Sequence, residues 1–114
     1  MTLHISLSES IGSPHAVSSA DGAAIHDRIA EGIRRDECVV LSFAGVEDVT
    51  SAFLNAAVGQ LYADLDEELI REKLRVVDAD GDHLVLLKRV VDRAKEFFRD
   101  PEQYSAALSG ALDE

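Results

Sequence analysis

The chain has 114 residues, of which 46% are hydrophobic, and its formal net charge is −11. A chain of this length suits one domain, and its aliphatic content excludes a disordered protein. The strong acidity excludes binding to nucleic acid or anionic lipid through the overall electrostatic field.

Cysteine content and the N-terminal segment indicate a cytoplasmic location. Cys38 is the only cysteine, which excludes a disulfide framework, and its apolar neighbours predict a buried thiol. The first residues, MTLHISLSES, lack the basic region and the long apolar core of a signal peptide. No apolar run approaches the roughly 20 residues that a membrane span needs.

The first third of the chain predicts two short strands and then a helix. Residues 2–7 alternate apolar and polar side chains, which is typical of a strand with one buried face. After Gly12 and Pro14, residues 15–18 are expected to form a second strand in a hairpin with the first. Apolar residues near helical spacing predict an amphipathic helix over 21–35, with its N-cap at Ser19 or Asp21.

The middle of the chain predicts a buried strand, a turn, a helix and another strand. The apolar run CVVLSF, residues 38–43, is typical of a central strand covered on both faces. The turn AGVED leads into a helix over about 51–65, and Leu74–Asp78 is the next strand. Gly59 inside the helix costs about 1 kcal/mol relative to alanine, which we attribute to close packing on the sheet.

The last third predicts a long amphipathic helix that Asp80 caps. Its apolar stripe contains Leu84, Leu87, Val91, Ala94 and Phe98. Pro101 ends this helix or begins a short last one that reaches Gly110. The alternation of strands and helices predicts an α/β fold with helices packed on a mostly parallel sheet.

Charge is unevenly distributed along the chain. Residues 82–99 hold five basic and three acidic residues, a charge of +2, so that the remainder carries −13. The simpler interpretation is a solvated helix face with ion pairs at helical spacing. The alternative is a docking face for an acidic partner.

Motifs for metal, phosphate or catalytic chemistry are absent from the sequence. The run DADGDHL fails as a calcium loop because Gly81 precedes Asp82 and the closing position falls on Arg89. The four histidines show no metal-ligand spacing, and the GxxxxGK[ST], GxGxxG and GxSxG motifs are missing. We therefore expect no metal, no cofactor and no enzymatic activity.

Two hydroxyl residues, Thr50 and Ser51, stand at the predicted start of the 51–65 helix. One of them is expected to cap the helix, a contribution of about 1 kcal/mol. The alternative is a phosphorylation site, where the added charge beside Glu47 and Asp48 would alter a docking surface.

The run VVLSFAGVEDVTSAFL resembles the core of STAS domains (sulfate transporter and anti-sigma-factor antagonist), and more closely a bacterial STAS-like family of unknown function. The positions that carry the resemblance are Phe43, Gly45, Val46, Ser51, Phe53 and Gly59. It implies a four- to five-strand, mostly parallel mixed sheet with helices packed on it. The chain would form a single STAS-like domain, with a core over about 3–99 and a C-terminal extension over 100–114.

The resemblance also implies a function. In anti-sigma-factor antagonists, a serine at the helix start is phosphorylated by a GHKL-type kinase. Aligned on Gly45-Val46, the aspartate of that motif falls on Thr50, its first serine on Ser51, and the acceptor serine on Ala52. The usual acceptor is therefore missing, and Ser51 or Thr50 would have to replace it.

The resemblance implies a non-enzymatic regulatory domain that binds a GHKL-type ATPase/kinase or another regulator, as a monomer or homodimer. The expected docking residues are Val46, Glu47, Asp48, Val49, Thr50, Ser51, Ala52 and Asn55. Two alternatives remain open. One is a small-ligand or nucleotide sensor, and the other is an acidic antitoxin or phage-defence adaptor that binds a basic partner.

Overall fold

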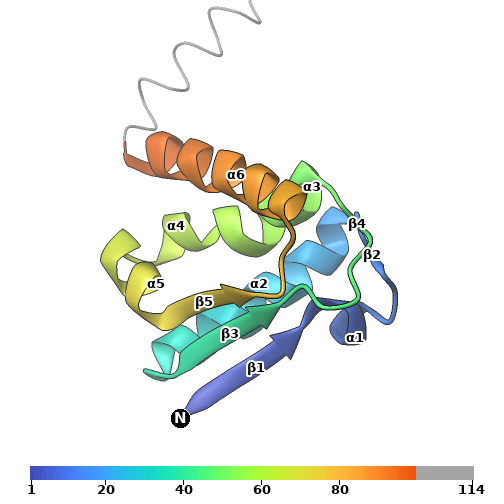
Figure 1. The fold of residues 1–114 in the computed structure, drawn as a ribbon. Coiled ribbons are helices and arrows are strands. Elements are labelled where there is room, and N and C mark those ends of the chain that lie inside the picture. The colour runs from blue at the N-terminus through green and yellow to red at the C-terminus, as the bar shows by residue number, and fades with distance from the viewer. Residues whose placement is uncertain (100–114) are drawn as a thin grey trace, which may run out of the picture.

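The computed structural model describes residues 1–99, in which helices pack on parallel strands (Figure 1). The last helix predicted after Pro101 lies outside these residues. None of the helices in this range has the length and apolar content that crossing a membrane requires. The elements are β1 (Thr2–Ser6), α1 (Leu7–Ile11), β2 (His15–Ala16), α2 (Ser19–Arg34), β3 (Cys38–Ser42), β4 (Asp48–Val49), α3 (Ser51–Leu54), the π-helical turn η1 (Asn55–Gly59), α4 (Leu61–Asp64), α5 (Glu67–Lys73), β5 (Leu74–Val77) and α6 (Gly81–Arg99).

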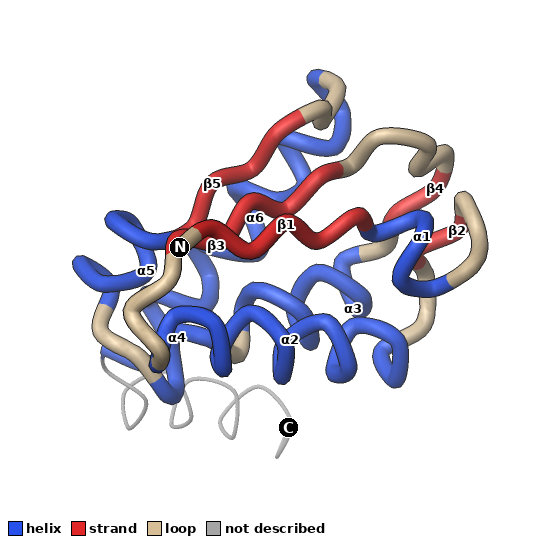
Figure 2. Tube along the Cα trace, turned by 90° about the horizontal axis from the view of Figure 1, so that it is seen from below, coloured by secondary structure: helices blue, strands red, loops and turns tan. Residues whose placement is uncertain are grey.

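The strands confirm the predicted α/β fold with a parallel sheet. β3 is central, with β1 and β5 parallel to it on either side (Figure 2). The predicted hairpin is wrong: β2 pairs in parallel with β4, in a separate two-stranded sheet. The reason is that α1 follows β1 directly, with Ser6 as its N-cap and Gly12 at φ 69° as its C-cap, and so carries the chain away from β1.

The three-stranded sheet is covered on one face, not on both as predicted for β3. Ile5, Val39 and Leu41 are fully buried beneath the helices. The alternate residues, such as His4 and Cys38, are exposed, so the predicted burial of the Cys38 thiol is also wrong. The sequence does not show that one face is open, because an apolar valine, Val40, lies on the outer face, where it is half-buried.

Helix α2 confirms the predicted amphipathic helix but begins earlier. Ser18 is its N-cap, in place of the predicted Ser19 or Asp21, and the Ser18 hydroxyl accepts hydrogen bonds from the backbone N–H of Ala20 and Asp21. Gly22 allows α2 to cross the α3 segment closely. A Cβ at this glycine would lie 2.5 Å from the carbonyl oxygen of Phe53.

The predicted 51–65 helix is present, with a π-helical turn inside it. The backbone N–H of Gln60 donates to the carbonyl of Asn55 at 3.0 Å, which is the hydrogen bond between residues five apart that defines a π-helix. Gly59 belongs to this turn. A Cβ there would lie 2.6 Å from Asn55 Oδ1, so the glycine makes room for the asparagine side chain rather than for the predicted contact with the sheet.

Helix α6 lies over α3 and α4 (Figure 1), and its predicted cap is confirmed. Asp80 Oδ1 accepts a hydrogen bond from the backbone N–H of His83 at 2.8 Å. The predicted position of Leu84 on the buried stripe is wrong, since Leu84 is 48% exposed and His83 is buried. The His83 ring packs on Phe43, with ring centroids 5.6 Å apart, and this contact sets the inner face of the first turn.

An ion pair joins the turn after α2 to the end of α5. Lys73 Nζ lies 2.8 Å from Asp36 Oδ1. The hydrogen bond and charge of Lys73 lower the pKa of Asp36 below its ordinary value of 3.8, and Asp36 in turn raises the pKa of Lys73. A lowered pKa in the folded state means that the carboxylate adds stability above the unfolded pKa, which is lost as pH falls through the folded pKa.

We therefore expect Asp36→Asn to lower the urea midpoint of unfolding at pH 7, with a small effect because the Asp36 carboxylate is exposed to solvent. The left-handed backbone at this position, φ 62°, suits asparagine as well as aspartate, so the change isolates the charge. The difference from wild type should vanish below the lowered pKa of Asp36. A difference that persists there would assign the effect to something other than the carboxylate charge.

Candidate functional site

Thr50 holds the start of α3. Its hydroxyl oxygen accepts a hydrogen bond from the backbone N–H of Phe53 at 3.1 Å and donates one to the carbonyl of Val17 at 2.9 Å. This confirms that one of the two hydroxyl residues caps the helix. The second bond ties the cap to the chain after β2, next to the β2–β4 pairing.

The predicted docking residues differ in exposure. Glu47, Asp48, Ser51, Ala52 and Asn55 are exposed. Val49 and Thr50 are half-buried, whereas Val46, at 9% exposure, belongs to the hydrophobic core.

Asp48 already has a partner, since its Oδ2 lies 2.6 Å from His15 Nδ1. The structure gathers Ser51, Ala52 and Asn55 beside one surface groove.

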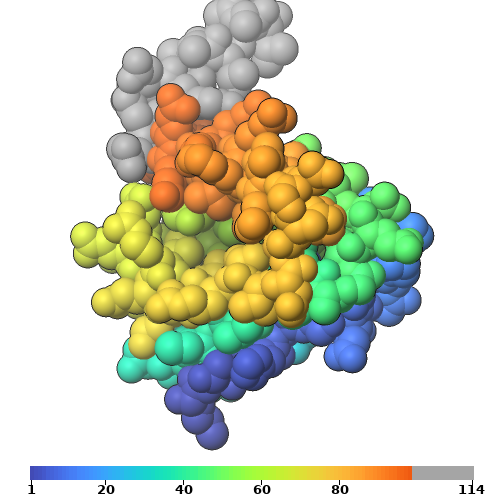
Figure 3. All heavy atoms as spheres, in the orientation of Figure 1, coloured from blue at the N-terminus to red at the C-terminus, as the bar shows by residue number. Residues whose placement is uncertain are grey.

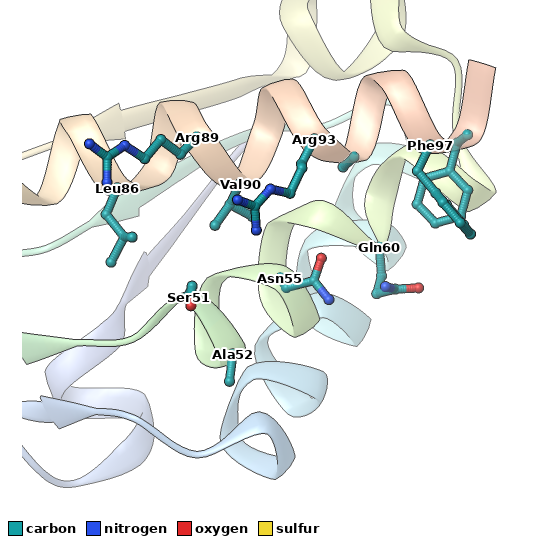
Figure 4. Close-up of a pocket in the computed structure, with 11 residues that line it drawn as sticks. Ser51, Ala52, Asn55, Gln60, Leu86, Arg89, Val90, Arg93 and Phe97 are labelled. Atoms are coloured by element: carbon teal, nitrogen blue, oxygen red, sulfur yellow. The ribbon is translucent and has the colours of Figure 1, made fainter. Parts of the chain in front are cut away.

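That groove, of about 620 Å³, separates the α3–η1 segment from α6 (Figure 4). Sequence reasoning found one wall and missed the other, which comes from α6. The only sequence signal for the second wall was the basic excess over 82–99. The lining residues are Ser51, Ala52, Asn55, Gln60, Leu86, Arg89, Val90, Arg93, Ala94, Phe97 and Phe98.

Two arginines border the groove without an ion-pair partner among residues 1–99. The neighbouring lysines of α6 are paired: Lys88 Nζ lies 2.9 Å from Asp92 Oδ2, and Lys95 Nζ lies 3.0 Å from Glu67 Oε1. Arg89 and Arg93 have no such contact in the described part of the chain. Figure 4 shows the Arg93 side chain directed toward the α3–η1 wall, while that of Arg89 extends along α6.

The groove offers hydrogen-bond donors over an apolar floor. The donors are two guanidinium groups, the amides of Asn55 and Gln60, and the Ser51 hydroxyl. The part of the chain that the structure describes contains no cluster of three or more His, Cys, Asp or Glu side chains able to hold a metal ion. Such a lining suits the binding of an anionic, partly apolar group.

A second, smaller cavity of about 220 Å³ lies on the other side of α6, against α5 and β5. Figure 3 shows the surface hollowed between α6 (orange) and the α5–β5 region (yellow). Tyr62 and Lys95 are among its lining residues. Burial and the nearby charge of Glu67 raise the pKa of Tyr62, so its phenol stays neutral and adds no charge to this cavity.

A family model described as a STAS-like domain of unknown function (DUF4325) matches residues 21–84, more than half of the chain. The chain belongs to this family. Comparisons with curated proteins and with solved structures give no significant match. The resemblance predicted from VVLSFAGVEDVTSAFL is thereby confirmed at the level of the family.

The matched part of this STAS-like domain runs from α2 to the first turn of α6. It contains the α3–η1 wall of the groove, including the exposed Ala52. Arg89 and Arg93 lie beyond residue 84. The basic wall is therefore a property of this chain that the family match does not describe.

The two hydroxyl residues of the STAS-like domain should respond differently to mutation. Thr50→Ala removes both hydrogen bonds of the cap, and we expect the free energy of unfolding to fall by about 1–2 kcal/mol. Ser51→Ala should change it by less than about 0.5 kcal/mol, since its exposed hydroxyl has no hydrogen bond within residues 1–99. Chemical denaturation of both variants measures the difference, and equal losses would contradict the assignment of the cap to Thr50.

Proposed function

We propose that this STAS-like domain is a non-enzymatic, cytoplasmic regulatory module that docks a protein partner through the start of α3 and the groove beside it. The observation that carries the proposal is the exposure of Ser51, Ala52 and Asn55 along a groove of about 620 Å³. The cap and the buried Phe53 hold this surface in a fixed conformation, so binding of a partner would cost little conformational entropy.

The partner class that the family resemblance suggests is a GHKL-type ATPase/kinase. If such a partner phosphorylates the domain, Ser51 is the better acceptor of the two hydroxyl residues. Its hydroxyl is exposed and has no hydrogen bond among the described residues, whereas that of Thr50 is engaged twice. Docking itself does not depend on this modification.

The test places a photo-crosslinking amino acid at Asn55 in the full-length chain, in the native cell. We expect one reproducible protein adduct at Asn55. The same probe at Ala24, which is exposed on α2 and outside the groove, should give none. Adducts of equal yield at both positions, or none at Asn55, would refute docking at this surface.

A small-ligand sensor is the second candidate function, because the groove volume of about 620 Å³ lies within the range of small-ligand pockets. Pockets for small ligands measure about 300–1,000 Å³. A ligand that binds only the folded state raises the unfolding temperature by an amount that grows with the logarithm of its concentration above Kd. A nucleotide that raises this temperature for wild type but not for Arg93→Gln would support the sensor, and the absence of any shift would remove it.

A further inference from the structure

The unpaired arginines of α6 are the strongest feature that the docking proposal leaves unexplained. The domain carries a net charge of −11, and acidic residues outnumber basic ones two to one. Among residues 1–99, five basic side chains form an ion pair, while others have no carboxylate partner: Arg28, Arg34, Arg75, Arg89 and Arg93. Lys88, Lys95 and Lys73 are among the paired side chains, at 2.9, 3.0 and 2.8 Å.

The two arginines occupy one side of the groove because of their spacing. Arg89 and Arg93 are four residues apart, which places them on the same face of α6, one turn above the other. Val90 and Ala94 follow each arginine by one position, and both are buried at the floor of the groove. The α6 wall thus repeats a pattern of a cation beside an apolar surface on successive turns.

The groove is long as well as charged. Its α6 wall runs from Leu86 to Phe98, a distance of about 18 Å at 1.5 Å per residue. A volume of about 620 Å³ spread over this length accommodates a row of side chains better than one compact molecule. The facing wall offers the amides of Asn55 and Gln60, which can bond to the backbone or side chains of a bound segment.

We propose that the groove binds an acidic, amphipathic segment of the partner protein. Carboxylates of that segment pair with Arg89 and Arg93, and its apolar side chains lie on Val90, Ala94 and Phe97. Guanidinium groups form paired, charge-assisted hydrogen bonds with carboxylates. These bonds are strong, and they fix the orientation of the carboxylate relative to the arginine. This inference rests on the proposed docking function and adds the chemistry of the partner.

Acidity of the segment would also make binding selective. The remainder of the domain is strongly acidic and repels an acidic segment from other surfaces, since like charges brought together are unfavourable. In the groove, Arg89 and Arg93 lie one helical turn apart and have no carboxylate of their own within residues 1–99.

The test uses two helix-forming peptides of about twelve residues, a length that matches the groove. Both carry leucines at helical spacing, but one has glutamates and the other glutamines at the remaining positions. Binding to the full-length chain is followed by NMR, including the Nε–H signals of the arginines. We expect the glutamate peptide to bind roughly tenfold more tightly, with shifts at Ser51, Asn55, Arg89 and Arg93.

Two double variants separate the arginine pair from a general charge effect. Arg89→Gln with Arg93→Gln should remove the preference for glutamate. Lys88→Gln with Arg34→Gln removes the same charge from exposed positions outside the groove, and it should keep the preference. Equal affinities of the two peptides for wild type, no binding of either, or shifts outside the groove would each overturn the proposal.

Two other occupants are outcomes of the same experiment, and each would overturn the proposal. A separate titration uses ATP in place of the peptides, and shifts at Arg89 and Arg93 with ATP alone would assign the groove to a small anion. Replacing Glu102, Asp113 and Glu114 by their amides in the full-length chain tests its own C-terminal segment. Movement of the arginine signals in that variant, without peptide, would assign the groove to residues 100–114.

Failure of this inference differs from failure of the docking function. Photo-crosslinking at Asn55 that persists in the Arg89→Gln, Arg93→Gln variant leaves docking intact and excludes an acidic segment. Ala52→Arg fills the groove with a bulky side chain, and loss of the adduct in this variant would support docking independently of the arginines.

Discussion

Phe53→Ala is expected to lower the free energy of unfolding by about 3–5 kcal/mol. Phe53 is fully buried in α3, which packs against α2 and α6, and its removal leaves a cavity that the surrounding side chains cannot fill. A domain of this size is stabilised by only about 5–15 kcal/mol, so the variant should be unfolded at temperatures where wild type is stable. Chemical denaturation followed by circular dichroism measures the loss.

The neighbouring residue provides the control. Ala52 precedes Phe53 in the same helix but is exposed, so Ala52→Ser should change stability by less than about 0.5 kcal/mol. Phe53→Leu, which keeps most of the buried volume, should lose less than Phe53→Ala. Similar losses for Phe53→Ala and Ala52→Ser would show that the cost comes from the helix backbone and not from the buried ring.

Gly22→Ala is expected to lower the free energy of unfolding by about 2 kcal/mol, although alanine favours helices by about 1 kcal/mol. The new methyl group would lie 2.5 Å from the carbonyl oxygen of Phe53 and 2.9 Å from Ala56 Cβ. A backbone oxygen cannot turn aside like the end of a side chain, so α2 and the α3 segment must move apart.

Gly81→Ala is the matched control for this change. Gly81 begins α6, and a Cβ there meets nothing within 4 Å. We expect this variant to be as stable as wild type or slightly more stable, because alanine restricts the unfolded chain. If both alanine variants gain stability, the close crossing of α2 and α3 does not limit the fold.

Local signals predicted the elements near the site well. The caps of α3 and α6 depend on a hydroxyl or carboxylate placed before an amphipathic helix, and that pattern is visible in the sequence alone. The resemblance added the strand–turn–helix order around Gly45, whose φ of 80° explains the need for glycine in that turn.

Predictions failed where the outcome depended on contacts distant in sequence. Nothing in the run before β2 reveals that His15 and Ala16 pair with β4 rather than with β1. The inward orientation of His83 depends on the Phe43 ring, forty residues earlier in the chain. The fit of Gly22 against Phe53 likewise exists only once two helices cross.

In the candidate site, too, local signals were predictable from the sequence and long-range contacts were not. The start of α3 was predictable because a capping hydroxyl residue stands directly before an amphipathic segment. Its facing wall was visible only as a net charge over 82–99, since no local pattern shows which lysines and arginines will find carboxylates. The pairing of Lys88 with Asp92 could be guessed from helical spacing, but that of Lys95 with Glu67 depends on the tertiary fold.

The π-helical turn η1 allows this surface to vary by a change in chain length, without any substitution. A turn closed by an i→i+5 bond holds one residue more than an α-helical turn. Deletion of a single codon within Asn55–Gly59 would close this turn with an i→i+4 bond, and the later residues would keep nearly the same orientation relative to Ser51. Gln60 would then stay at the groove and Thr50 would still cap the helix, so a change in the length of this turn alone could alter the groove wall in domains with the same core.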